Sequence, residues 1–219
     1  MPVFLLTDDI IFPHPVLRDD DGLLAFGGDL SPERLLLAYR WGIFPWYAEG
    51  QPLMWWWLCP RLLVRPDEVH ISHSLKSRLR KSEYEVTFNS RFDEVVSRCA
   101  SVKRKDQDGT WITREMREAY VRMHQMGHAQ SVEVWHDGVL VGGLYGVRIN
   151  NIFCGESMFA EMPDASKVGF VHLARVLSAS GCKWIDCQQD TPHMRSLGGK
   201  LYDEDEYLEI LRLNQLVKC

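Results

Sequence analysis

The sequence predicts an α+β fold with a mixed sheet, and the order of patterns after residue 110 carries this prediction. A segment with apolar residues at helical spacing comes first, three strand-like segments follow, and a helix, a strand and a last helix complete the chain. A run of strands between helices is typical of α+β domains. The 219 residues are 46% hydrophobic and 25% charged, so the chain is long enough and apolar enough to bury a core.

The first 60 residues are rich in aromatic residues, glycine and proline. Ser31 followed by Pro32 and Glu33 predicts a helix start, because serine caps the first amides and an acid favours the positive end of the helix dipole. This helix is expected to end near Arg40, before Gly42. Prolines interrupt the chain after that point, and we expect a domain boundary near residue 62.

The remaining elements follow from capping residues, turn signals and periodicity. Thr113 begins a helix that Gly127 closes, and Asp137-Gly138 predicts a hairpin turn. We expect further helices over residues 74–81, 90–100, 166–178 and 204–217, and strands over residues 131–135, 139–147, 152–159 and 183–188.

The charge is unevenly distributed along the chain. The net charge of −5 argues against a protein whose whole surface binds nucleic acid. Residues 61–105, however, carry 11 basic and 6 acidic side chains. This basic segment is either a solvated surface or a local phosphate-binding patch. It contains Lys76, Arg78, Arg80 and Lys81, and then Lys103-Arg104-Lys105.

The sequence favours a cytoplasmic protein without a membrane span or a metal site. No apolar run approaches the roughly 18–20 residues that span a bilayer, and no basic region precedes the short apolar run before Asp8 and Asp9. The six cysteines are therefore expected to be reduced thiols. Cys182, Cys187 and His193 match no familiar zinc-ligand spacing, so no metal is expected.

Several polar residues stand where a purely structural role is unexpected. Glu156 lies within the apolar strand 152–159. Asp186 and Gln188 lie two residues apart in the strand 183–188, so we expect their side chains on one face. His193 and Ser196 follow in a predicted loop. Each could make a structural hydrogen bond or ion pair, but together they indicate a site.

Aromatic residues crowd the end of the first region, and most of them are expected in the core. Trp55, Trp56 and Trp57 are consecutive, so they cannot all face inward on an extended segment. At least one should line a surface or cleft, where its ring could stack on a base or hold an apolar group.

A series of motifs, in order from about residue 10 to 210, resembles the leucyl/phenylalanyl-tRNA–protein transferase family. A chance match to so many motifs in one order is not credible. The motifs are Asp21-Gly-Leu-Leu-Ala-Phe-Gly-Gly-Asp-Leu-Ser-Pro-Glu33, Gly42-Ile-Phe-Pro-Trp46, Trp55-Trp56, Gly109-Thr-Trp-Ile-Thr113, Ser131-Val-Glu-Val-Trp135, Leu140-Val-Gly-Gly-Leu-Tyr-Gly146, Gly155-Glu-Ser-Met-Phe159, Ala165-Ser-Lys167, Asp186-Cys-Gln188, His193 and Ser196-Leu-Gly198.

The resemblance implies a small N-terminal α/β domain, residues 1–62, packed on a catalytic domain, residues 63–219, with an acyl-CoA N-acyltransferase-like (GNAT-like) fold. It implies transfer of leucine or phenylalanine, and in some cases methionine, from aminoacyl-tRNA to the N-terminal Arg or Lys of a protein. The modified protein would then enter the bacterial N-degron route. The family implies cytoplasmic action and no metal or organic cofactor.

The resemblance also assigns site residues. Glu156, Asp186 and Gln188 match the centre proposed for chemistry and acceptor binding. The positions at or near the donor end and its side-chain pocket are matched by Trp46, Trp111, Tyr120, Leu144, Phe153 and Ile185. The basic residues Lys76, Arg78, Arg80 and Lys81 are the candidates for contact with tRNA phosphates.

Three stretches depart from the family pattern. Trp57-Leu-Cys-Pro-Arg61 keeps only the Pro and Arg of the usual Ser-Pro-Asp-Pro-Arg. Leu201-Tyr-Asp-Glu-Asp-Glu206 replaces the usual Ile-Pro-Arg, which removes any phosphate contact from that arginine. Gln130 stands where the family usually has histidine before Ser-Val-Glu.

The donor ester is already activated, so the protein must position an amine and manage one proton. Gln188 is a poor base, and we expect it to orient the amine. Asp186 would polarise this network or accept the proton through it, unless the terminal ribose hydroxyl carries the proton. Glu156 is the better candidate for the acceptor's cationic group. Cys154 and Cys187 flank the site, but no histidine pairing indicates a cysteine nucleophile.

Three alternative functions remain open at this point. An acyl-CoA N-acetyltransferase would need a pyrophosphate-binding glycine loop, and after Arg195 only Gly198 fits, because Lys200 occupies the second glycine position. A tRNA-binding module without catalysis would not depend on Asp186 and Gln188. A related transferase that modifies a small amine would account for the altered stretches.

Overall fold

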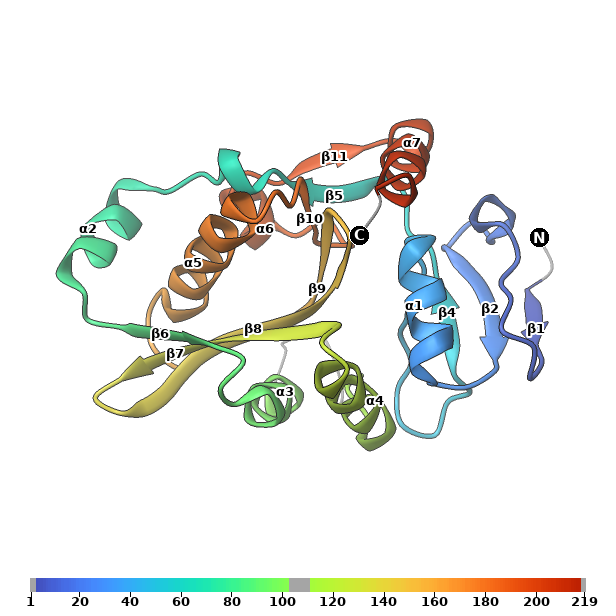
Figure 1. Ribbon diagram of the computed structural model, residues 1–219, viewed down its shortest axis with the longest axis horizontal. Helices are drawn as coiled ribbons and strands as arrows, with labels where there is room; N and C mark the ends of the chain where they lie inside the picture. Colours follow the sequence, from blue (N-terminus) through green and yellow to red (C-terminus); the bar gives the residue numbers. More distant parts are fainter. Residues whose placement is uncertain (1–2, 103–110, 218–219) are drawn as a thin grey trace.

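The computed structural model describes residues 3–102 and 111–217, which form two sheets of unequal size (Figure 1). The strands of the smaller sheet are β1 (Phe4–Leu6), β2 (Leu23–Gly27), β3 (Phe44–Pro45) and β4 (Met54–Trp56). Their spatial order within the described ranges is β1, β2, β4, β3. With helix α1 (Pro32–Arg40) and the short 3-10 helix η1 (Pro15–Leu17), they form the small domain.

Helix α1 confirms the predicted start and end. The Ser31 side chain accepts a hydrogen bond from the Arg34 amide, and Pro32 occupies the first turn. Trp41 is the C-terminal cap, and Gly42 follows with a φ of 70°, a left-handed conformation that glycine adopts without strain.

The larger sheet is mixed, as predicted. Its strands are β5 (Arg61–Val64), β6 (Glu85–Phe88), β7 (Ala129–His136), β8 (Val139–Ile149), β9 (Ile152–Ala160), β10 (Trp184–Asp186) and β11 (Lys200–Tyr202). In the part of the chain that the structure describes, the spatial order is β11, β5, β10, β9, β8, β7, β6. Strands β7, β8 and β9 form an antiparallel meander, and β10 pairs parallel to β9 and antiparallel to β5.

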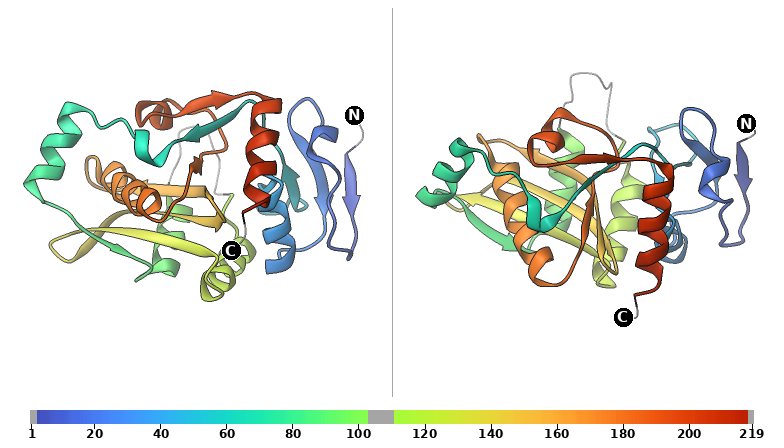
Figure 2. Two further views of the ribbon diagram at one scale, coloured as in Figure 1. Left: turned by 45° about the horizontal axis from the view of Figure 1, so that its top comes forward. Right: turned by 90° about the horizontal axis from the view of Figure 1, so that it is seen from above.

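Helices cover both faces of the larger sheet (Figure 2). Helices α3 (Phe92–Ser101) and α4 (Arg114–Gln125) pack on one face, and α5 (Ala165–Ala179) packs on the other. Neighbouring residues of β8 serve the two faces, since Tyr145 belongs to the cluster around α3 and α4, and Leu144 to the cluster around α5. The remaining elements are η2 (Pro66–Glu68), α2 (His73–Lys81), α6 (Pro192–Ser196) and α7 (Glu204–Gln215).

Three kinds of local expectation differ from the structure. Strands β5, β6 and β11 are missed by periodicity, because β5 is buried along its whole length and the other two are short edge strands. The strand expected over 183–188 covers only Trp184–Asp186. His193 and Ser196 belong to helix α6 and not to a loop, since Thr191 caps a helix that Pro192 begins.

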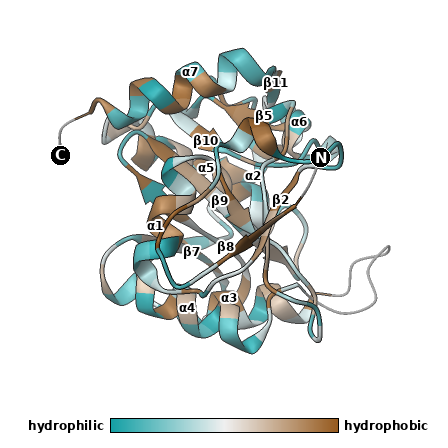
Figure 3. Cartoon of the chain, turned by 90° about the vertical axis from the view of Figure 1, so that its right-hand side faces the viewer, coloured by the Kyte–Doolittle hydropathy of each residue, from teal (hydrophilic) through white to brown (hydrophobic). Residues whose placement is uncertain are grey.

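The small domain packs against the larger sheet and against α7, as Figure 3 shows from the small-domain side. The expected fold class, α+β with a small N-terminal domain packed on a larger one, is confirmed. Strand β4 ends at Trp56 and β5 begins at Arg61, and we keep the division at residue 62 as a proposal. Among the described helices, none is long and apolar enough to cross a membrane.

The three consecutive tryptophans alternate in burial along the extended segment. Trp55 and Trp57 are fully buried, whereas Trp56 is partly exposed, as the sequence predicts for at least one of them. The Trp56 ring lies 5.5 Å from the Trp46 ring, and its indole nitrogen donates to the Trp46 carbonyl. Trp56 therefore supports Trp46.

Candidate active site

A pocket of about 570 Å³ opens where strands β9 and β10 stop pairing. Their parallel register ends at Asp186 opposite Cys154, while β9 continues beside β8 to Ala160. The separated strand ends leave room between them, and this volume is in the usual range for small-molecule sites. The apolar wall is formed by Phe44, Pro45, Trp46, Trp111, Leu144, Phe153, Met158, Phe170, Leu173, Ile185 and Met194.

A β-bulge directs Glu156 into the pocket. Tyr145 of β8 pairs with Ser157, and Gly146 pairs with Gly155, so Glu156 is the extra residue between them. A bulge re-aims a side chain and is common next to functional sites. Gly146 allows the close approach, because a Cβ there would collide with the Cys154 carbonyl.

Within the part of the chain that the structure describes, Glu156 has only neutral hydrogen-bond partners. Its Oε1 accepts from the Gln188 side-chain amide at 3.0 Å, and its Oε2 accepts from the Tyr120 hydroxyl at 2.8 Å. The Tyr120 oxygen in turn lies 2.5 Å from the Tyr39 oxygen of the small domain. Burial raises the pKa of Glu156 to about 7, and the hydrogen bonds from Tyr120, Tyr39 and Gln188 only partly offset this rise. The carboxyl group can therefore gain or lose a proton near neutral pH.

Asp186 is fully buried and does not line the pocket. Its two oxygens accept from Arg61 Nε at 2.8 Å and from Arg61 Nη2 at 2.9 Å, in the bidentate geometry of a strong ion pair. The Tyr207 hydroxyl donates to the same carboxylate at 2.7 Å. Asp186 therefore faces Arg61 and Tyr207, and the expectation that Asp186 and Gln188 share one strand face is wrong.

Gln188 lies in a turn after the strand, and this explains the difference. Its φ is 60°, a left-handed conformation that reverses the alternation assumed from the sequence. The Gln188 backbone amide donates to Asp186 Oδ1 at 2.9 Å, while its side chain reaches Glu156. The side chains of Glu156 and Gln188 are thus in contact in the pocket. Asp186 lies outside the pocket lining and holds the turn through the Gln188 backbone amide.

The structure brings together most of the predicted donor-site residues. Trp46, Trp111, Leu144, Phe153 and Ile185 all line the pocket. Tyr120 is buried behind Glu156 and is not part of the lining.

Residues that the sequence did not single out complete the pocket. Phe170 and Leu173 come from α5, three residues apart on one helix face. Their apolar spacing could have indicated a buried face, although not which space it borders. Thr191 and Met194 carry no distinguishing sequence signal, whereas Phe44, Pro45 and Met158 lie within the motifs at residues 42–46 and 155–159 but were not assigned to the pocket.

The cysteines near the site are poor nucleophiles. Burial raises the pKa of the Cys187 thiol, which lines the pocket, and that of the buried Cys154 thiol. His193 also lines the pocket, and burial lowers its pKa. The described residues contain no group of three or more metal-ligating side chains, while Cys219 lies outside them.

The basic residues of α2 lie at the opposite end of the molecule from α7 (Figure 1). Arg78 pairs with Glu83 and Asp164, and Lys81 lies 3.7 Å from Glu83. Lys76 and Arg80 are exposed, and neither forms an ion pair with the described part of the chain. Residues 103–105, together with Gly109 and Thr110, lie outside the described ranges.

An apolar cavity that ends at a carboxyl–carboxamide pair is the arrangement of an enzyme that holds an apolar group beside a reacting centre. The leucyl/phenylalanyl-tRNA protein transferase family matches residues 63–212, and the N-terminal domain of that family matches residues 28–57. The chain therefore belongs to the leucyl/phenylalanyl-tRNA–protein transferase family, and it is a transferase.

Related proteins are similar in sequence to this chain over almost their whole length. A leucyl/phenylalanyl-tRNA–protein transferase of Syntrophobacter fumaroxidans is 52% identical over 98% of this chain and 92% of the relative. One of Stutzerimonas stutzeri is 52% identical over 98% of this chain and 95% of the relative. Similar solved structures include a GCN5-related N-acetyltransferase from Kribbella flavida, with 10% identity, a TM-score of 0.40, and coverage of 76% of this chain and 59% of that chain.

Proposed function

We propose that this chain transfers leucine or phenylalanine from aminoacyl-tRNA to the α-amino group of a protein's N-terminal Arg or Lys, with methionine as a further candidate donor. The observation that carries this proposal is the apolar pocket that ends at Glu156 and Gln188. Family membership supports an aminoacyl-tRNA donor and a protein acceptor.

The donor side chain would occupy the apolar part of the pocket, between Leu144, Phe153 and Ile185. Trp46 and Trp111 would flank the aminoacyl ester and the terminal adenosine, because flat rings suit stacking on a base. A charged side chain would lose its hydration in this cavity, whereas Leu, Phe and Met differ by only about 1–3 kcal/mol per methylene group. The pocket thus favours a class of donors over a single amino acid.

The acceptor's cationic end would approach Glu156. An α-ammonium group has a pKa near ~7.7–8.0, so most of it must lose a proton before it can attack. Glu156, with a pKa of about 7 and no cationic partner within residues 3–102 and 111–217, is suited to attract the ammonium group and to take that proton. Gln188 would orient the amine beside the ester carbonyl.

The bond changes balance without a further reactant. The ammonium group first loses one proton to Glu156, which passes it to solvent. The neutral amine nitrogen then bonds to the ester carbonyl carbon, the ester C–O bond breaks, and a second proton of the amine ends on the released 3′-terminal ribose oxygen. Glu156 or a neighbouring ribose hydroxyl would carry this second proton. Both carboxylate oxygens of Asp186 already accept hydrogen bonds from Arg61 and Tyr207. The role of Asp186 would therefore be to hold the Gln188 turn and not to take the proton.

The wider setting follows from the same proposal. The reaction would take place in the cytoplasm, and the modified protein would be marked for degradation by the N-degron route. Lys76 and Arg80, with Arg78 and Lys81 beside them, would contact tRNA phosphates through the exposed face of α2. No cofactor is required, because the ester supplies the driving force.

A labelled-donor assay tests the proposal. We would incubate the protein with radiolabelled leucyl-, phenylalanyl- or methionyl-tRNA and peptides that differ only in the first residue. Transfer to peptides beginning with Arg or Lys, and not to Glu or Gly, is expected. Equal transfer to a small amine would favour the alternative acceptor class, while CoA binding in calorimetry without peptide labelling would favour an acyl-CoA enzyme.

A further inference from the structure

Two buried side chains hydrogen-bond to Asp186 without lining the pocket themselves. Arg61 and Tyr207 are 1% and 0% exposed, and both donate to the Asp186 carboxylate. Neither lines the pocket. A bidentate Arg–Asp pair with an added hydroxyl donor fixes the carboxylate in position, because each oxygen has defined partners.

The Asp186 carboxylate also accepts a further hydrogen bond, which holds the Gln188 turn in place. Asp186 Oδ1 accepts the Gln188 backbone amide, and the adjoining Cys187 amide donates to the Leu62 carbonyl at 2.9 Å. Gln188 has a φ of 60°, a conformation that costs free energy for a residue with a Cβ and persists only where its surroundings hold it. Strand β5 thus supports this turn twice, by the Arg61 side chain and by the Leu62 backbone.

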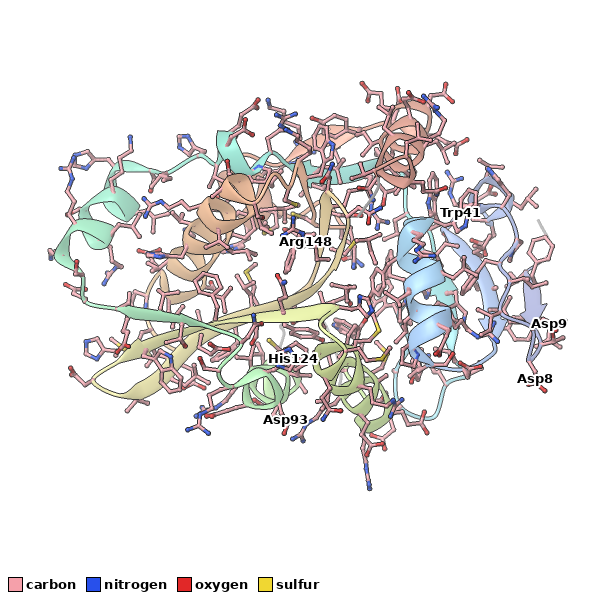
Figure 4. All side chains as sticks on the ribbon, in the orientation of Figure 1. Asp8, Asp9, Trp41, Asp93, His124 and Arg148 are labelled. Carbon is pink, nitrogen blue, oxygen red and sulfur yellow. The ribbon has the colours of Figure 1, made fainter. Side chains whose placement is uncertain are left out.

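The same two side chains contact the small domain. The Arg61 guanidinium carbon lies 5.1 Å from the centre of the Phe44 ring, and Phe44 lines the pocket. The Tyr207 ring lies 5.6 Å from the Trp57 ring, and a Cβ at position 42 would collide with the Tyr207 hydroxyl. The Trp57 indole nitrogen donates to the carbonyl of Trp41 at the end of α1 (labelled in Figure 4), and Gln215 of α7 donates to the neighbouring Arg40 carbonyl at 3.2 Å. The small domain and α7 therefore enclose the Arg61–Asp186–Tyr207 cluster.

We propose that Arg61 and Tyr207 are positioning residues for the transfer reaction. Through Asp186 they hold the left-handed turn that presents the Gln188 side chain to Glu156 and to the acceptor amine. Because the cluster is enclosed by the small domain and α7, correct packing of these two parts sets the geometry of the reacting centre. This inference rests on the proposed function for its kinetic effects, but its structural effect can be measured without activity.

The kinetic test is the Tyr207→Phe variant, which removes one hydroxyl and keeps the ring. We expect kcat with an Arg-initiated peptide to fall about tenfold, equivalent to about 1.4 kcal/mol of activation free energy. The dissociation constant for leucyl-tRNA should change less than twofold, since the hydroxyl is remote from the donor wall. Arg61→Lys should act in the same direction, because lysine cannot reproduce the bidentate pair.

A double-mutant cycle with Gln188→Ala separates positioning from a general structural role. If Tyr207 acts through the Gln188 side chain, Tyr207→Phe should lower kcat less than twofold once that side chain is absent. The control is Tyr84→Phe, whose hydroxyl donates to the Pro163 carbonyl at 2.9 Å away from the pocket. An equal loss in both backgrounds, or no loss in the wild-type background, would overturn the proposal.

Hydrogen exchange provides a readout that needs no activity. In Tyr207→Phe, the amides of Cys187 and Gln188 should exchange about tenfold faster, while those of β7 and β8 stay unchanged. Unchanged exchange at residues 187–188 would refute the positioning role. An inactive wild-type protein with the expected exchange change would instead refute the proposed function and leave the positioning role supported.

Discussion

The two carboxyl groups of the site lie on neighbouring strands but in opposite environments. Asp186 is fully buried and holds a bidentate ion pair with Arg61. Glu156 faces the pocket, and its hydrogen-bond partners among the described residues, Tyr120 and Gln188, are neutral. Burial without a cationic partner favours the protonated form of a carboxyl group, and this is the environment of Glu156 among the described residues.

The different environments give the two carboxyl groups, Asp186 and Glu156, different roles, although the sequence analysis assigned both to one site. Asp186 cannot reach a ligand and acts on the site through the Gln188 backbone. Glu156, with a pKa of about 7, can exchange a proton and can face a cationic acceptor. Substitutions that alter one environment at a time can therefore separate structural from chemical roles.

The largest effect is expected for Asp186→Asn. Because Arg61 would remain buried without its counter-charge, the free energy of unfolding should fall by about 3–5 kcal/mol, and misplacement of Gln188 should slow transfer roughly 100-fold. Asp93 provides the control, since it also forms a bidentate pair, with Arg117, but on an exposed surface (Figure 4). Asp93→Asn should change stability by less than about 1 kcal/mol. Urea unfolding and single-turnover rates measure both, and equal effects of the two substitutions would contradict the account.

Glu156→Gln should affect chemistry more than stability. The amide keeps the size of the side chain but cannot accept the amine's proton, so we expect transfer to fall about 100-fold at pH 7.5. The matched control is Glu133→Gln, because Glu133 is a buried carboxyl group that accepts from Ser131 and Thr87 and does not line the pocket. That substitution should lower the melting temperature and leave the single-turnover rate nearly unchanged. Similar rates for both variants would remove Glu156 from the chemistry.

Leu144→Ala should weaken donor use selectively. A smaller side chain in the pocket wall should lower kcat/KM for leucyl-tRNA by roughly tenfold or more, because each methylene contact in an apolar pocket is worth about 1–3 kcal/mol. Val134→Ala is the control, since Val134 is equally buried but does not line the pocket. Uncharged tRNA should bind both variants alike. Unchanged kinetics for Leu, Phe and Met donors would make Leu144 a core residue only.

The smallest effect concerns the α2 surface, which is remote from both carboxyl groups. The double variant Lys76→Ala/Arg80→Ala should raise KM for every aminoacyl-tRNA by the same factor. It should also flatten the slope of log affinity against log salt by about 1.4, which is about 0.7 for each phosphate that is no longer neutralised. Arg114→Ala/Arg212→Ala, which also removes two exposed cations, is the control. If the salt slope is unchanged, these charges only keep α2 hydrated.

Residues with strong local preferences were predictable from the sequence. Ser31 and Thr113 cap helices where expected, and Asp137-Gly138 forms the turn between β7 and β8 with positive φ at both positions. Glu156 was identifiable because a carboxyl group in an apolar strand needs an explanation. The helix caps, the turn and the unusual position of Glu156 each depend on residues that are neighbours in the sequence, so they can be recognised without the fold.

The orientation of the carboxyl groups was not predictable, because it depends on departures from regular strands. Gly155 inside the strand is only a weak signal for the bulge that turns Glu156 into the pocket, and nothing in the sequence marks the positive φ at Gln188. The best missed signal is Arg61, which begins the apolar run Arg61-Leu-Leu-Val64. A buried arginine requires a carboxylate partner, but only the fold shows that the partner is Asp186.

The pH dependence of unfolding in wild type and Glu156→Gln tests the contrast between the two carboxyl groups most directly. The pKa of Glu156 rises from 4.5 to about 7 on folding, so the folded state binds more protons than the unfolded state. Relative to Glu156→Gln, the wild type should therefore lose up to about 3 kcal/mol of stability as the pH rises from 4.5 to 7. Groups common to both proteins cancel in this difference. A stability difference that stays constant across this range would contradict the account.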